Sequence, residues 1–237
     1  MACKRLHGKP HTCPERASTY CEGMQTTPLP ADGRRSGAVL AFLAAGDLTT
    51  FAWLATDAVR APGLAAREAL SRAAAEQMEH YDELVRMLAQ DGGTGADVEP
   101  FLDLLEEVGT RTEPGSWEER LLRTGLVGGM VRDLGEVLAE LLAPERRERA
   151  LTGRRAPDDL IVGLLGARLA ADEPLRARLS LWGRRIAGEA LGVLPPVIAA
   201  LVAASDGDEG VAALGAPAMS QMSARHARRM DGLGLTA

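Results

Sequence analysis

Apolar residues recur at helical spacing along most of the chain after residue 36, and no segment shows the alternation typical of a strand. The sequence predicts helices over roughly residues 36–60, 64–90, 98–108, 117–142 and 217–230, with two more beginning near residues 157 and 174. Turns rich in proline and glycine separate these segments. Long helices joined by short breaks predict an all-α fold, an up-and-down helical bundle with additional C-terminal helices.

Acidic residues interrupt several of the predicted apolar stripes. Three of the interrupting residues are Asp47, Asp133 and Glu189. A fourth interruption is the stretch EQMEHYDE, residues 76–83, where Glu76 and His80 are four residues apart and share one helix face. Charged groups are stable in a core only when something pairs with them, so these side chains are candidate functional residues. A neighbouring hydroxyl or arginine offers a structural explanation for such residues.

Other features of the helices carry expectations of their own. The helix that begins near Pro157 is nearly all apolar, which predicts burial on most of its sides. Gly125, Gly128 and Gly129 would be costly in an isolated helix, so another backbone is expected to approach there, either from the same chain or across a homodimer. His226 lies among arginines and is expected at a surface or an interface.

Composition narrows the classes of function. Aromatic residues are only 3% of the chain, so the core is built from Ala, Leu and Val, a mixture that favours helix. The net charge of −6 argues against a surface that generally coats nucleic acid. Acids interrupt the densest basic run, residues 145–155. No apolar run reaches the ~18 residues of a membrane span, so the protein is expected to be cytoplasmic, with no membrane partner.

The first 36 residues differ from the rest of the chain. They hold all three cysteines, Cys3, Cys13 and Cys21, at spacings that match no common zinc module. They are also rich in proline, which predicts a disordered N-terminal extension before a helical domain over residues 37–237. Elsewhere the sequence contains no phosphate-binding loop, nucleophile elbow or HExxH motif.

Five segments together resemble a known family. They are GDLTTF, AAAEQMEHYDELVRML, SWEERLL, LSLWGRRIAGEAL and ARHARRMDGLGL, and they span roughly residues 37–235. In these segments the chain resembles the actinobacterial branch of the MiaE-like ferritin-like proteins. That group is named after the tRNA 2-methylthio-isopentenyladenosine hydroxylase, whose fold is a helical bundle and whose cofactor is a pair of iron ions.

The resemblance implies a set of metal ligands and also reveals departures from the family pattern. The implied ligands to one or two iron ions are Asp47, Glu76, His80 and Asp133, with Asp159 or Glu189 completing the set. Gln77 stands where the Glu-x-x-His motif requires a glutamate three residues before the histidine. Pro157 falls where the second histidine of the family is expected.

Two functions are therefore set out as hypotheses. The first is a ferritin-like helical protein that resembles the di-iron tRNA hydroxylases but has a partly degenerate metal site, and that acts as a structural or binding protein. The second is an active, oxygen-dependent di-iron hydroxylase whose substrate is a modified tRNA base or another hydrophobic small molecule. A single-metal site built from His80 and two acids is an intermediate between them.

Overall fold

The computed structural model describes residues 31–153 and 158–237, which form α-helices and no strand. The helices are α1 (Ala31–Val59), α2 (Leu64–Gln90), α3 (Gly95–Arg111), α4 (Trp117–Ala139), α5 (Pro144–Leu151), α6 (Asp158–Ala171), α7 (Glu173–Gly192), α8 (Leu194–Ala204), α9 (Glu209–Ala212) and α10 (Gly215–Gly232). The predicted all-α bundle is therefore confirmed. Residues 1–30 of the predicted extension lie outside the described residues, whereas residues 31–36 belong to α1.

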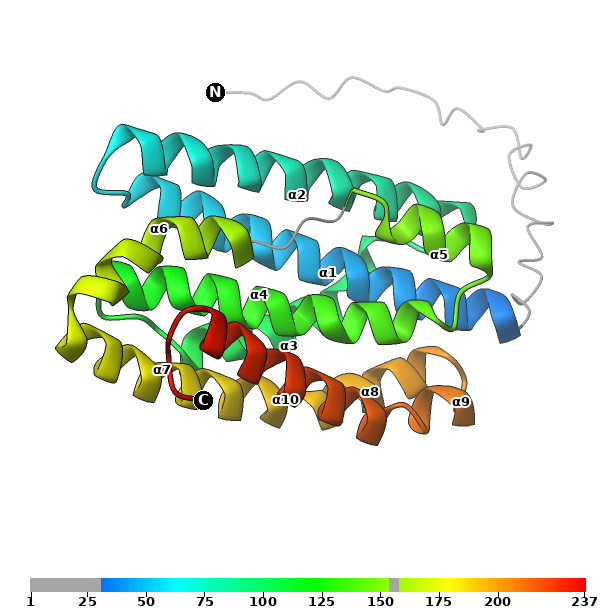
Figure 1. Ribbon diagram of the computed structural model, residues 1–237. Helices are drawn as coiled ribbons and strands as arrows, with labels where there is room; N and C mark the ends of the chain where they lie inside the picture. The colour runs from blue at the N-terminus through cyan, green and yellow to red at the C-terminus, as the bar shows by residue number, and fades with distance from the viewer. Residues whose placement is uncertain (1–30, 154–157) are drawn as a thin grey trace, which may run out of the picture.

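Helices α1 and α4 occupy the centre of the bundle (Figure 1). Helix α1 packs against α2, α3 and α4, and α4 packs in turn against α6, α7 and α10. Figure 1 shows α2 above α1, while α7 and α10 lie on the opposite side of α4. This central position explains why α1 and α4 are buried over most of their surface.

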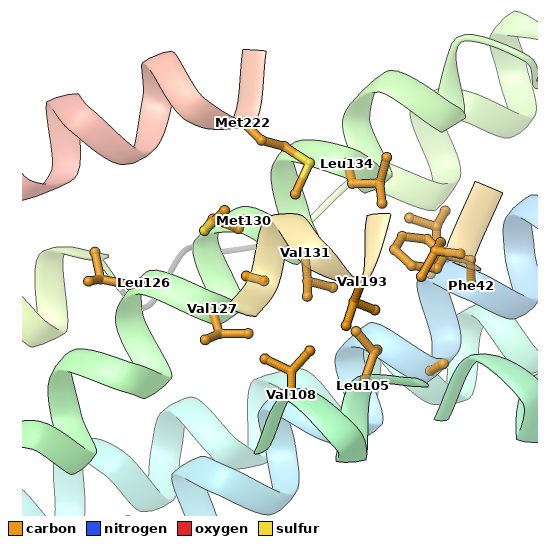
Figure 2. Close-up of a cluster of buried hydrophobic side chains, with 14 of the residues drawn as sticks. Phe42, Leu105, Val108, Leu126, Val127, Met130, Val131, Leu134, Val193 and Met222 are labelled. Atoms are coloured by element: carbon orange, nitrogen blue, oxygen red, sulfur yellow. The ribbon is translucent and has the colours of Figure 1, made fainter. Parts of the chain in front are cut away.

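A continuous apolar core joins the helices around α4. Figure 2 shows side chains from α1, α3, α4, α10 and the α7–α8 junction meeting in this core, among them Phe42, Met130, Val193 and Met222. The rings of Phe42 and Phe101 meet edge to face with their centroids 5.8 Å apart. Aliphatic side chains fill nearly all of the remaining core, as the low aromatic content predicts.

Local sequence signals set several helix boundaries. The Ser116 hydroxyl accepts a hydrogen bond from the Glu119 backbone N–H and caps α4, as expected for a serine followed by two acids. The Asp172 carboxylate caps α7 by accepting from the Leu175 backbone N–H. Pro195 and Pro196 lie in the first turn of α8, where proline needs no amide hydrogen, so they begin a helix directly after α7 ends.

The glycines of α4 make room for side chains and not for a second backbone. A Cβ at Gly125 would lie 2.9 Å from Cγ1 of Ile161 on α6. A Cβ at Gly129 would lie 2.5 Å from Nε of Arg229 on α10. At Gly125 and Gly129 the expectation of a close backbone contact within the chain was therefore wrong, because the residues that enter these spaces are a branched aliphatic side chain and an arginine.

Helix α6 is less buried than its composition predicts. Only Ile161, Leu165 and Leu169 are buried, one residue per turn along a single stripe. Val162, on another face, is 43% exposed. The prediction of burial on most sides was wrong because α6 lies at the edge of the bundle, where only the stripe that faces α4 and α7 finds a partner.

Two helical stretches of the described chain, Asp32–Val59 and Glu173–Ala204, are long and apolar enough to cross a membrane by length and composition alone. The first is the central helix of the bundle, and 72% of its apolar window is buried inside the protein. In the second stretch that share is 33%. Because a core helix passes the same test, these lengths are weak evidence for a membrane protein.

Candidate functional site

Asp47 and His80 form the polar contact between α1 and α2. The His80 Nδ1 atom lies 2.6 Å from Oδ2 of Asp47, and both side chains are buried. The other ring nitrogen, Nε2, lies 3.1 Å from the backbone carbonyl oxygen of Thr152. A carboxylate and a carbonyl oxygen both accept hydrogen bonds, so the two bonds together occupy both nitrogens of the ring. The structure thus brings together two of the residues that the sequence singled out.

Glu76 does not take the place of Gln77. The buried face of α2 includes Leu70, Ala74, Gln77 and Leu84, a spacing of three and four residues along one stripe. Gln77 is therefore inside the bundle, where it has polar interactions, and Glu76 is exposed on another face. The expectation that Glu76 lies on the inward face was wrong, because adjacent helical positions differ in direction by about 100°.

Asp133 lies in the C-terminal half of α4 and is fully buried, with 0% of its surface exposed. Its Oδ2 accepts from Arg229 Nη1 at 2.6 Å, and its Oδ1 accepts from Arg229 Nη2 at 2.8 Å and from Arg225 Nη1 at 3.0 Å. Arg225 also pairs with Glu136, one turn along α4. Burial alone would lower the pKa of Arg229, but the ion pairs with Asp133 and Asp158 raise it overall.

The remaining predicted ligands lie elsewhere. Asp159 is exposed at the start of α6. Its neighbour Asp158 is the residue that joins the network, accepting from Arg229 Nε at 3.0 Å and from Arg132 Nη2 at 3.1 Å. Glu189 is half-buried and lies 3.7 Å from Arg111 on α3. Neither Asp159 nor Glu189 is brought to His80 or Asp133, and Pro157 lies outside the described residues.

A family model described as a ferritin-like domain of actinomycetes matches residues 34–205, from α1 to the end of α8. The chain belongs to this ferritin-like family. No curated protein matches the chain. Asp47, His80 and Asp133 lie inside the matched region of the ferritin-like domain. Arg225 and Arg229 lie beyond it, on α10, so the cations that neutralise Asp133 come from outside the matched domain.

The donor set of this ferritin-like bundle does not fit a di-iron centre. Such a centre requires several carboxylates and two histidines that converge on the metals. Within the residues that the structure describes, no three His, Cys, Asp or Glu side chains gather into a group that could hold a metal ion. His80 uses both ring nitrogens for oxygen partners, and two guanidinium groups bind the Asp133 carboxylate. Of the side chains that the family pattern assigns to iron, Asp47 and His80 are thus bonded to each other and Asp133 to two arginines.

A second buried polar cluster joins α1 and α4, and the sequence patterns did not predict it. The Thr124 hydroxyl donates to Asp57 Oδ2 at 2.7 Å, and Arg120 lies 3.6 Å from Oδ1 of the same carboxylate. Burial raises the pKa of Asp57. The guanidinium of Arg123 stacks over the ring of Trp53 at 4.8 Å, and burial lowers its pKa. Asp57 lies three residues after Leu54, in register with the buried stripe, and this spacing was the available signal.

His226, which was expected at a surface or an interface, is buried inside the chain beside the Asp133 network. Only 5% of its surface is exposed, and neither ring nitrogen has a hydrogen-bond partner among the described residues. Burial lowers its pKa, and the nearby positive charge of Arg229 lowers it further. His226 is therefore held as a neutral ring. It shares one face of α10 with Met222 and Met230, four residues away on either side, and that pattern could have indicated burial.

Proposed function

We propose that this chain is a ferritin-like helical protein that folds and works without a di-iron centre, as a structural or binding protein. The observation that carries the proposal is the state of Asp133. This carboxylate, which the family resemblance assigns to iron, is fully buried on the face of α4 that packs against α10, and it is bound by Arg225 and Arg229. The two guanidinium groups supply positive charge to a residue that the resemblance assigns to a metal site.

The energetics of burial favour arginine over a metal ion as the partner of the Asp133 carboxylate. A fully buried carboxylate without a partner is destabilising by several kcal/mol, and a bidentate arginine offsets that cost through charge-assisted hydrogen bonds. A metal ion would first have to displace Arg229, which would leave a buried guanidinium without its main partner. Asp47 is likewise held by His80, across the interface of α1 and α2.

A second candidate function is the oxygen-dependent di-iron hydroxylase, acting on a modified tRNA base or another hydrophobic molecule. One observation favours it. An acid from the first helix and a histidine from the second lie in contact, as the resemblance to the MiaE-like group requires of two ligands. The proposal of a metal-independent bundle remains stronger because Gln77, Glu76 and Asp133 do not complete the set.

Iron analysis separates the two functions. We expect protein expressed in iron-supplemented medium to contain far less than one iron ion per chain, and its melting temperature to be unchanged by added Fe²⁺. Two ions per chain, with a higher melting temperature, would instead establish the hydroxylase-type centre.

Two variants sharpen this experiment. Gln77→Glu restores the Glu-x-x-His spacing at a buried position, and Glu76→Gln alters an exposed one. We expect neither variant to gain iron, because Asp133 remains bound to its arginines. Loss of iron in Glu76→Gln would show that the exposed glutamate is a ligand and would contradict the proposal.

A further inference from the structure

A surface groove runs between α1 and α2, at the end of the bundle where these two helices join (Figure 1). Its volume is about 350 Å³. Two antiparallel rows of residues, each spaced four apart, form its walls: Phe51, Ala55 and Val59 on α1, and Arg67, Ser71 and Ala75 on α2. Small side chains occupy much of both rows, so the space between the two helices stays open to solvent.

The groove has a charged end and an apolar end. Arg67 lies beside Val59, next to the connection between the helices, and its Nη2 atom donates to the Val59 backbone carbonyl oxygen at 3.2 Å. Because α1 and α2 run in opposite directions, Phe51 and Ala75 lie at the other end of the groove. At ~1.5 Å of helix rise per residue, Phe51 and Val59 are about 12 Å apart along α1. This layout matches a ligand with a polar head and an apolar tail.

The charge at the polar end indicates an anionic head. Arg67 is exposed, and no carboxylate of the described residues forms an ion pair with its guanidinium group. The acid next to it in the sequence, Glu68, lies 3.9 Å from Arg72 instead. Arg60, in the connection between the two helices, is likewise exposed and forms no ion pair with a described residue. An accessible guanidinium group without a carboxylate partner is complementary to an anion that a ligand brings.

Exposed aliphatic side chains lie at the same end of the bundle. Val59, which lines the groove, is 74% exposed, and Leu64, the first residue of α2, is 71% exposed. Among the described residues these are the two most exposed large aliphatic side chains. An alkyl chain in the groove would cover apolar surface of Phe51 and Val59 that now faces water, and the hydrophobic effect favours that burial.

The volume limits the size of the ligand. A dry apolar cavity of about 150 Å³ holds benzene, which has six heavy atoms. By the same scale a groove of about 350 Å³ holds a molecule with roughly fourteen heavy atoms or fewer. We propose that the groove binds a single-chain carboxylate of medium length, with its alkyl chain directed toward Phe51 and its carboxylate paired with Arg67. This inference names a ligand class for the proposed binding role of the bundle and rests on that role.

The test uses octanoate as the probe, followed by the NMR signals of alanine methyl groups in the groove. We expect saturable shifts with a Kd in roughly the millimolar range for a ligand of this size. The neutral 1-octanol should bind about two- to fivefold more weakly, the ratio that an exposed ion pair contributes. Octylammonium should bind more weakly still, and acetate, which lacks the chain, should give no saturable shift. Absence of saturable shifts with octanoate, or equal binding of octanoate and octylammonium, would overturn the proposal.

Arg67→Gln tests the head of the ligand. We expect this variant to bind octanoate only as well as it binds 1-octanol, while its affinity for 1-octanol stays that of the natural protein. The matched control is Arg86→Gln, at another exposed arginine of α2 that does not line the groove. Octanoate binding that Arg67→Gln leaves unchanged, or an equal loss of both probes in this variant, would contradict an ion pair between the carboxylate and Arg67.

Ala75→Leu tests the place of the chain. Ala75 is exposed and lines the groove, so a leucine there occupies the space without disturbing the core. We expect loss of the octanoate shifts at an unchanged melting temperature, whereas Ala89→Leu, at an exposed alanine of α2 outside the groove, should bind octanoate normally. A dimer in sedimentation equilibrium that Ala75→Leu dissociates would assign the groove to a second copy and overturn the proposal. Iron content is measured on separate samples, so a failure of octanoate binding is distinguishable from a failure of the metal-independent function.

Discussion

Individual residues of this ferritin-like bundle show two ways to hold a buried carboxylate. Asp133 accepts three hydrogen bonds from two arginines. Asp57, also with 0% of its surface exposed, accepts one short bond from the Thr124 hydroxyl, and its nearest arginine is 3.6 Å away. Burial raises the pKa of Asp57 because the weaker bonding does not replace the lost hydration. Of the two carboxylates, Asp133 has the fuller set of charge-assisted hydrogen bonds.

His226 gives a prediction of pH dependence at the same scale. Its folded-state pKa lies below the ordinary value of 6.5, so the unfolded chain binds the proton more readily. The stability linked to His226 is therefore fully present above about pH 6.5 and is lost as the pH falls toward the lower folded-state pKa. We expect the free energy of unfolding to fall by up to about 1.4 kcal/mol per pH unit in this window. Urea unfolding at a series of pH values measures the slope.

The matched variant for this prediction is His226→Leu, which keeps an apolar side chain of similar reach at the buried position. It removes the titrating group and should flatten the slope below about pH 6.5 relative to the natural protein. An identical slope in both proteins would assign the acid sensitivity to other groups.

At the scale of elements, α10 packs against α4 where a glycine of α4 leaves space for a side chain of α10. Arg229 lies against Gly129 of α4, and Met230 lies against Gly183 of α7. These two consecutive residues of α10 therefore fill spaces beside glycines on two different helices. Helical glycine is intrinsically unfavourable by ~1 kcal/mol relative to alanine. The contacts with α10 offset this cost, since the notch at Gly129 lets Arg229 reach the Asp133 carboxylate.

Substitution of Gly129 tests this packing. In Gly129→Ala the new Cβ would lie 2.5 Å from Nε of Arg229, whose guanidinium is fixed by Asp133 and Asp158. We expect a loss of about 1–3 kcal/mol in the free energy of unfolding, despite the better helix propensity of alanine. Chemical denaturation provides the measurement.

Gly188→Ala is the control, because a Cβ at Gly188 meets open space in α7. That variant should gain up to about 1 kcal/mol from helix propensity. If both alanine variants were stabilised to the same extent, the notch at Gly129 would have no role in holding α10.

At the scale of the whole molecule, acidic residues outnumber basic residues. The net charge is −6. The basic residues of α5 are engaged locally, because Arg146 pairs with Asp91, Arg147 with Glu140, and Arg149 with Glu83. The described part of the densest basic run is therefore a set of paired surface charges and provides no free cationic surface for phosphates.

The net negative charge and the paired arginines of α5 predict weak binding to tRNA. At roughly physiological salt we expect no retention of tRNA in a filter-binding assay at micromolar protein. A double variant, Arg146→Gln with Arg149→Gln, should behave like the natural protein, because these arginines are already occupied by carboxylates. Micromolar or tighter binding that the double variant weakens would revive tRNA as a partner.

The sequence by itself determined the helical class, most helix boundaries and the identity of two buried acids. Helical periodicity and capping residues are local signals, so α2 and α4 begin at the residues that the pattern predicts. Asp47 and Asp133 are both buried because each falls within an apolar stripe, and the spacing of that stripe can be read from the sequence alone. The match to the ferritin-like family, over residues 34–205, also comes from the sequence.

Only the tertiary structure decided what those acids do. Which of two adjacent residues, Glu76 or Gln77, points inward depends on the rotation of α2 against α1, and the two positions differ in direction by about 100°. The partner of Asp133 lies 96 residues away on α10, so no local pattern links it to Arg229. Spacing reveals that a buried charge needs a partner, whereas packing between distant helices decides whether that partner is a metal, a histidine or an arginine.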